Sequence, residues 1–201
     1  MPRPHRTLIL ALVGLLAGPG ILRAQSSVRL SAGATLGTPL VRDELGGPIT
    51  LKPAVAPTIS VAVTHPVGLG YRLMLEGQFG TSQLRVTDRG ETDDLGSLRT
   101  IGALLLLDGP IRGALHWQAG GGALAYRPAD KLGVFAGDSP TRWLLAAGAN
   151  WSRPLTSDLN LLITARYDYS TFTTRRLDQV GYSQFTTVQR IGLFAGVERR
   201  F

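Results

Sequence analysis

A period-two alternation of apolar and polar residues runs through the chain after residue 26 and limits its fold more than any other feature. Side chains of a β-strand point to its two faces in turn, so this pattern predicts strands with one apolar and one polar face. Eight segments carry it: 28–36, 59–64, 71–79, 98–107, 115–123, 143–152, 159–170 and 190–201. Segment 98–107 is apolar on both faces at its end, which leaves its facing ambiguous.

The connections between these segments alternate strictly in length. Three are short and turn-like, at 66–70, 108–110 and 153–158, and four are longer and polar, at about 38–56, 87–96, 127–140 and 173–184. Short turns at one end and long loops at the other are typical of transmembrane barrels. The fold class that we predict is therefore all-β, an eight-stranded antiparallel up-and-down transmembrane β-barrel with both termini at the turn end.

Charged residues of both signs gather on the more polar face of these strands, and the opposite face is nearly free of charge. A charge buried without a partner is costly. In a barrel whose apolar face contacts lipid and whose polar face lines a closed lumen, both the apolar and the charged residues are satisfied. We expect an interior polar network that pairs across the lumen, with its register left open, formed by Arg72, Glu76, Arg166, Asp168, Arg190 and Glu198.

Barrel size limits what such a lumen can do. Eight strands enclose a space just wide enough to be filled by side chains, so a large aqueous pore is not expected. A narrow ion path gated by exchange of partners is the alternative. Aromatic residues fall near the strand ends, as in the interfacial girdles of membrane barrels: Tyr71, Trp117 and Trp151 on the turn side, and Phe79, Trp143 and Tyr169 on the loop side.

The first residues have the layout of a secretory signal peptide. Arg3 and Arg6 precede an apolar run at 8–16, which is followed by Gly18-Pro19-Gly20 and then Ala24. The run is shorter than the roughly 20 residues that a membrane-spanning helix needs. We predict a signal peptide at 1–24 and a barrel domain at 25–201, with the exact cleavage position open and an uncleaved anchor helix as the alternative.

Composition narrows the remaining chemistry. The chain has no cysteine, so lipid-modified cysteine, disulfides and thiolate metal sites are excluded. The net charge is +7, and without the three arginines of residues 1–24 the balance is 18 basic against 14 acidic residues, or +4. These cations are spread along the chain, so we expect no nucleic-acid partner. No cluster of His, Asp and Glu indicates a metal, and no cofactor is expected.

Catalysis by an activated serine needs a histidine beside it and a carboxylate that orients the histidine. Beyond residue 24 the only histidines are His65 and His116, and neither has a serine two residues away. We expect no catalytic residues. Arginines at the bases of the loops would lie near lipid phosphates, although interfacial solubility explains them equally well: Arg127, Arg142, Arg175 and Arg176.

The last segment, 189–201, ends on an aromatic residue with alternate apolar residues before it: Leu193, Val197 and Phe201. This resembles the C-terminal assembly signal of bacterial outer-membrane barrels, although Arg199 stands where an apolar or aromatic residue is usual. With the strand pattern of 27–201, the chain resembles the small eight-stranded OmpA/OmpX-type barrel superfamily. The resemblance implies a bacterial outer-membrane location, contact with lipid and lipopolysaccharide, recognition by the barrel-assembly machinery, and a monomer.

Three functions remain open at this point. The first is a structural or surface-interaction role carried by the extracellular loops of a barrel without a large pore. The second is a lipid A-modifying enzyme, because deacylases and acyltransferases occur on this scaffold. The third is a soluble periplasmic, lipocalin-like barrel that binds an apolar ligand.

Overall fold

The computed structural model describes residues 26–43, 49–88, 90–129, 139–174 and 186–201. The predicted signal peptide, 1–24, lies outside the described residues, as do 130–138 and 175–185 of two predicted loops. The strands are β1 (Ser27–Gly37), β2 (Val41–Asp43), β3 (Ile49–Pro53), β4 (Ala56–Gly68), β5 (Tyr71–Asp88), β6 (Glu91–Arg112), β7 (Leu115–Pro128), β8 (Thr141–Pro154), β9 (Leu159–Phe172) and β10 (Thr186–Arg200). No helix of the described residues has the length and apolar character needed to cross a membrane.

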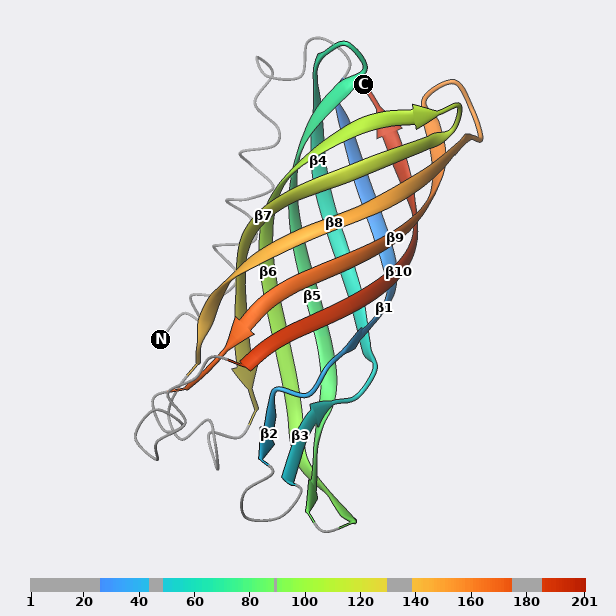
Figure 1. Cartoon of the computed structure of the whole chain (residues 1–201). Helices are drawn as coiled ribbons and strands as arrows, with labels where there is room; N and C mark the ends of the chain where they lie inside the picture. The colour runs from blue at the N-terminus through green and yellow to red at the C-terminus, as the bar shows by residue number, and fades with distance from the viewer. Residues whose placement is uncertain (1–25, 44–48, 89, 130–138, 175–185) are drawn as a thin grey trace, which may run out of the picture.

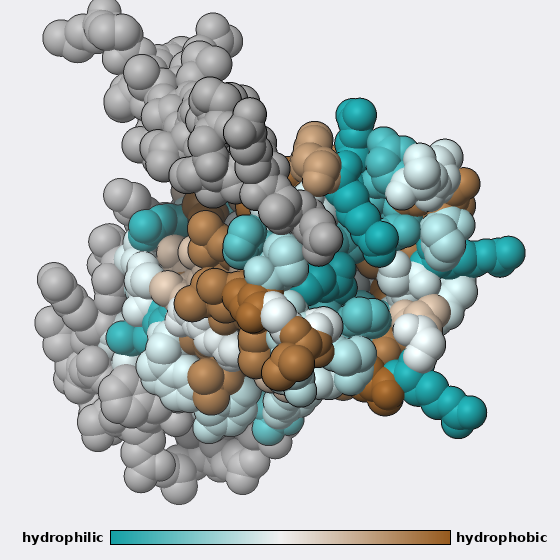
Figure 2. Space-filling view, turned by 90° about the horizontal axis from the view of Figure 1, so that it is seen from above, coloured by the Kyte–Doolittle hydropathy of each residue, from teal (hydrophilic) through white to brown (hydrophobic). Residues whose placement is uncertain are grey.

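Eight of these strands form a closed antiparallel barrel (Figure 1). The ring runs β4-β1-β10-β9-β8-β7-β6-β5 and returns to β4, so the first and last strands of the chain pair with each other. The predicted fold class is confirmed. The barrel end at which the C-terminus lies is the turn end, where hydrophilic side chains project from the rim beside exposed hydrophobic residues (Figure 2).

Two predicted loops are more regular than expected. The segment 38–56 contains the hairpin β2–β3, whose second strand pairs with β5 from Thr50↔Thr87 to Pro53↔Leu84. The segment 87–96 is the end of a long hairpin, because β5 runs to Asp88 and β6 begins at Glu91. Threonine and valine in these stretches favour strands although the surrounding residues are polar. The loop end therefore extends beyond the barrel as a paired sheet (Figure 1).

The turn predicted at 108–110 was wrong. Strand β6 continues to Arg112, and the turn lies at Gly113, which has a φ of 57°. Pro110 fits within the strand because the pairing with β7 shifts register between Pro110 and Arg112, and proline is tolerated at such irregularities near a strand end. The correction moves Asp108 from a turn into a strand, where its side chain points inward and is fully buried.

Burial alternates along the strands in the sense expected of a membrane barrel. On β6 the even residues from Leu98 to Asp108 are buried except the half-buried Thr100, whereas Ile101 and Leu105 are exposed, which resolves the ambiguous facing of this segment. Aromatic pairs lie on the outer surface toward both ends: Tyr71 with Trp117 at 6.2 Å between ring centroids, and Trp143 with Tyr169 at 5.4 Å. Along the middle of the barrel the outside is apolar and the charged strand residues face inward, the reverse of a soluble barrel.

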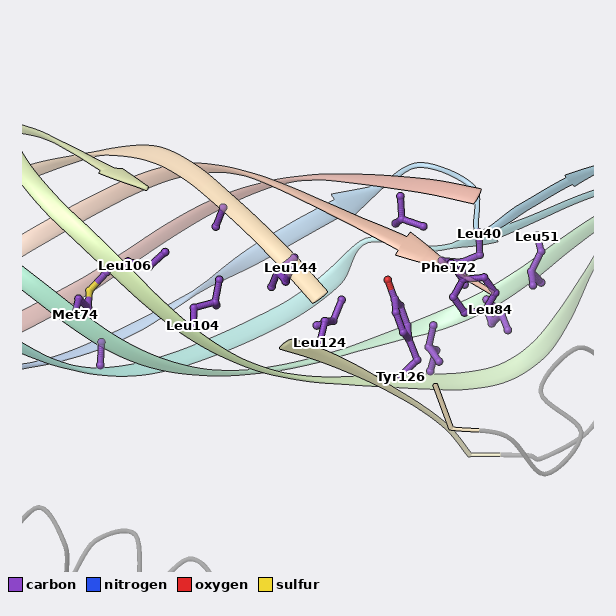
Figure 3. Packing of buried hydrophobic residues seen from close by; sticks show 14 residues of the cluster. Leu40, Leu51, Met74, Leu84, Leu104, Leu106, Leu124, Tyr126, Leu144 and Phe172 are labelled. Atoms are coloured by element: carbon purple, nitrogen blue, oxygen red, sulfur yellow. The ribbon is translucent and has the colours of Figure 1, made fainter. Parts of the chain in front are cut away.

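The interior is less uniformly polar than the sequence indicated. A cluster of buried hydrophobic residues runs along the inside of the barrel (Figure 3). Leu40, Leu51, Leu84 and Phe172 lie together near the loop end, and the ring of Tyr126 packs edge-on against Phe172 at 5.2 Å. These apolar side chains are buried, and they fill this half of the lumen as side chains fill a protein core.

Leu105 tests which face meets lipid, because it lies mid-strand on β6 with 52% of its surface exposed. We expect Leu105→Lys to destabilise the barrel folded in lipid vesicles by about 2–4 kcal/mol, the cost of a cation near the bilayer midplane. Urea titration followed by tryptophan fluorescence measures it. The control is Leu69→Lys in the β4–β5 turn, where Leu69 is 93% exposed and little change is expected. Equal stability of both variants would support a soluble barrel instead.

Candidate functional site: an ion network inside the barrel

The first of two ion clusters lies inside the turn end of the barrel. Arg72 bridges two carboxylates, with its Nη2 2.8 Å from Asp108 Oδ1 and its Nη1 3.0 Å from Glu198 Oε1. Arg29 Nη2 lies between the same two acids, at 3.8 Å from Asp108 and 3.7 Å from Glu198. The Ser27 hydroxyl donates to Glu198. Two guanidinium groups face two carboxylates, so the cluster is neutral overall.

Asp108 is the most connected acid of this turn-end cluster. Asn150 Nδ2 donates to Asp108 Oδ2 at 2.9 Å and to Gln118 Oε1 at 3.1 Å. His116 Nδ1 lies 3.1 Å from Asp108 Oδ1. Thr164 in turn donates to Asn150 Oδ1 at 2.6 Å. Through these bonds Asp108 joins four strands, β5 to β8, into one polar network, and Thr164 adds β9.

The second cluster lies farther toward the loop end. Arg166 donates through Nη1 to Glu76 and through Nη2 to Gln78 Oε1 at 2.6 Å, and its Nε is 2.9 Å from Asp168 Oδ1. Arg190 Nη2 donates to Asp168 Oδ2 at 2.8 Å. This cluster also contains two cations and two anions. Charge-assisted bonds of this kind compensate for the desolvation of the buried groups.

Strand register places some of these partners side by side and brings others together across the lumen. Arg72↔Asp108 and Arg190↔Asp168 are directly opposed residues of neighbouring strands. Arg166 on β9 and Glu76 on β5 belong to strands that do not pair, so their contact exists only because the sheet closes. The network can therefore form only when the barrel is closed and its strands are in the correct register.

Glycines make room for the long side chains of the second cluster. The ring of Phe194 lies 5.1 Å from the guanidinium carbon of Arg166, and a Cβ on Gly192 would come within 2.5 Å of Phe194 Cε2. A Cβ on Gly102 would likewise lie 2.5 Å from Gln78 Nε2. Alanine at either glycine would displace a side chain that holds Arg166 in place.

The six residues predicted for the interior network all lie in these two clusters, with Arg72 and Glu198 in the first and the other four in the second. Sequence reasoning missed Asp108 because a Gly-Pro pair follows it and was interpreted as a turn. The parity of β6, counted from Leu98, would have placed it inside. Arg29 shares the polar face of β1 but was left out of the predicted network, as was Asn150.

The two histidines form separate contacts. Ser26 Oγ lies 3.0 Å from His65 Nδ1, and His116 pairs with Asp108. In the part of the chain that the structure describes, neither histidine contacts both a serine and a carboxylate, so neither completes the relay that an activated serine requires.

Comparison with known proteins rests on structure. No family model matches the sequence, and no curated protein matches it. Among solved structures, Neisserial surface protein A (NspA) has a TM-score of 0.54 at 16% identity, covering 88% of this chain and 97% of that one. OprG from Pseudomonas aeruginosa has a TM-score of 0.54 at 12% identity, covering 89% and 96%. Outer membrane protein AlkL has a TM-score of 0.54 at 14% identity, covering 92% and 93%.

The chain has the fold of the small outer-membrane β-barrels. Its exposed apolar belt is the surface that this fold presents to lipid, and its length is close to that of these neighbours. The barrel is thus a protein of the bacterial outer membrane. At identities this low, the structural match establishes the fold alone. The activity has to be argued from the chemistry of the residues themselves.

Removing one partner from the second cluster should be costly. We expect Arg166→Met to lower the free energy of unfolding by about 3–5 kcal/mol, because Glu76 is left as a buried charge without its guanidinium. Adding Glu76→Gln to this variant should recover part of the loss. Urea unfolding of the barrel in detergent or lipid vesicles measures both.

The control for this pair is Arg153→Met, at an exposed position beside the β8–β9 turn, where a change within about 0.5 kcal/mol is expected. A double variant as unstable as the sum of its two single variants would show that Glu76 and Arg166 are not coupled.

Proposed function

We propose that the barrel is a non-enzymatic outer-membrane protein with a structural or surface-interaction role carried by its loop end, without a large pore. The observation that carries this proposal is the filled lumen. Both ion clusters are neutral, and apolar residues occupy the interior between them and the loops. A barrel filled in this way is a rigid scaffold that holds the loop end in place. The loop end is the part that is free to vary in sequence and to bind a partner.

The space between the two clusters is small. A cavity of about 10 Å³ is lined by Arg29 and Gln118 on one side and by Glu76 and Arg166 on the other. That is about the room of a single water molecule. A gated ion path through this point would need Arg166 to leave Glu76, and each partner left behind would be a buried charge.

The paired sheet at the loop end is the surface most available to a partner. The β5–β6 hairpin carries exposed Glu91, Asp93 and Asp94 near its tip, with Thr87 and Thr92 paired below the tip. The Thr87 and Thr92 hydroxyls are 3.2 Å apart. A charged, hydrogen-bonded hairpin that extends past the barrel is suited to contacts outside the membrane.

The proposal extends to assembly and surroundings. Leu193, Val197 and Phe201 lie exposed along the outer face at the C-terminal strand, and Arg199 sits 5.7 Å from the Phe201 ring. We propose that this outward row is the part that the barrel-assembly machinery recognises. The same exposed face contacts outer-membrane lipid and lipopolysaccharide, and the barrel acts as a monomer.

Conductance tests the filled lumen. In planar bilayers the wild-type barrel should show no steady current of the size given by an open aqueous channel. Replacing both Glu76 and Arg166 by alanine enlarges the cavity between the clusters and should produce small, steady steps. Wild-type steps as large as those of the variant would contradict the proposal.

The role of the loop end is tested in cells that lack the protein. They are complemented with the full chain or with a chain in which 87–92 is replaced by Asn-Gly, a two-residue turn that suits the opposed pair Val86↔Asp93. We expect the shortened barrel to assemble, shown by different gel migration before and after boiling, but not to restore surface attachment or envelope integrity.

Lipid A from the same strains serves as the control for catalysis. Its mass should be identical with and without the barrel. A mass difference would support the lipid A-modifying enzyme instead, and full activity of the shortened barrel would show that this hairpin does not carry the function.

A further inference from the structure

Two pairs of like charges stand directly opposite each other on the outer surface. Lys52 on β3 is paired with Arg85 on β5, and Arg99 on β6 is paired with Arg127 on β7. All four side chains are exposed. Like charges at directly opposed positions of neighbouring strands destabilise a sheet, so an arrangement that repeats this twice calls for a compensating anion.

These pairs lie beyond the loop-side edge of the apolar belt. On β6 the outward series runs from Leu105 through Ile101 and then meets Arg99. On β5 it runs through Leu75 and Phe79, and the polar Thr81 and Gln83 follow before Arg85. In an outer-membrane barrel the edge of the belt on the loop side is the level of the outer-leaflet headgroups.

A surface depression adjoins the first pair. It has a volume of about 550 Å³, and its lining includes Lys52, Arg85, Thr87 and Thr92 together with Leu36 and Val55. The apolar pair is 57% and 52% exposed. Ammonium, guanidinium and hydroxyl donors therefore lie beside an apolar floor that continues into the belt. This arrangement complements an anionic headgroup that is joined to hydrocarbon chains.

The described part of the chain compensates these cations poorly. Asp94 approaches Arg85 to 4.0 Å, and both side chains are more than half exposed, so the pair contributes little. Among the described residues, the hydrogen-bond acceptor of Arg127 is the neutral Ser139 carbonyl, at 3.0 Å. Within the described residues, no carboxylate lies within 4.0 Å of Lys52, Arg99 or Arg127.

We propose that the Lys52–Arg85 pair binds a phosphate of a phosphorylated glycolipid of the outer leaflet, whose acyl chains run along Leu36 and Val55. The Arg99–Arg127 pair takes a second phosphate nearer the apolar belt, because Arg99 opposes Thr81, four residues before Arg85 on β5. Arginine's planar fork suits phosphate oxygens, and lysine adds a point charge. The inference rests on the membrane placement of the barrel and is independent of the role of its loop end.

The test uses the barrel extracted from outer membranes in neutral detergent and stripped of lipid. Lipid A is titrated into wild type, Lys52→Gln/Arg85→Gln and Arg99→Gln/Arg127→Gln, with binding followed by native mass spectrometry. We expect each double variant to lose about tenfold in affinity. Boiled and unheated gel samples verify that each variant is folded, and Arg85→Lys, which keeps the charge without the fork, should lose less.

The matched control is Arg112→Gln/Arg153→Gln, which removes two exposed cations at the turn end, and it should bind lipid A as wild type does. Dephosphorylated lipid A should bind wild type as weakly as lipid A binds the variants, and millimolar inorganic phosphate should not compete. Equal loss in the control, or tight binding of the dephosphorylated lipid, would overturn the proposal. Competition by inorganic phosphate would overturn it in favour of a small-anion site.

Discussion

Hydrocarbon offers no hydrogen-bond partner to a peptide group, so a sheet that crosses a bilayer must bond every strand edge to another strand. Here the pairing of β1 with β10 satisfies that requirement, and the rest of the architecture depends on it. Closing a ring of only eight strands leaves a narrow lumen. Everything that points inward is then removed from both lipid and bulk water, and each inward charge must find its partner within a few ångströms.

The two neutral clusters meet this demand. A buried ion pair contributes little net stability compared with apolar packing, but the loss of one member is expensive. Such pairs therefore favour the strand register that keeps their members together over registers that separate them. A one-residue slip of β9 would turn Arg166 and Asp168 toward lipid and bring apolar neighbours inward. The contact of Arg166 with Glu76 forms only between strands on opposite sides of a closed ring, which gives the polar interior a role in specifying the barrel as well as filling it.

The residues of the outer surface also need suitable partners, and here the lipids of the membrane supply them. Its apolar belt is solvated by lipid chains, so residues such as Leu105 need no protein contact. The cations beyond the belt stand opposite one another on neighbouring strands. Headgroup phosphates are the anions that this level of a membrane supplies. The inside of the barrel is thus neutralised by its own residues, and the loop-side rim by its surroundings.

Much of this follows from local pattern. Alternation is a property of each strand by itself, so the eight strands, the facing of all of them but 98–107, and the membership of Arg166 and Glu198 in an inner network were predictable. Asp108 was not, because its local context of Gly109-Pro110 indicates a turn, and only the bulge against β7 lets the strand continue. The β2–β3 hairpin was not predicted for a related reason, since β3 is a strand through its pairing with β2 and with the extended end of β5.

By itself, the sequence determined which residues face lipid and which face the lumen in every strand but 98–107, since that depends on parity along each strand. The tertiary structure decided which charges meet. Arg166 and Glu76 are 90 positions apart, Arg72 and Glu198 are 126 apart, and their contacts depend on the stagger at which the ring closes. Stagger is a property of all the strands together, because it fixes which inward-facing residues of one strand lie opposite those of the strands across the lumen.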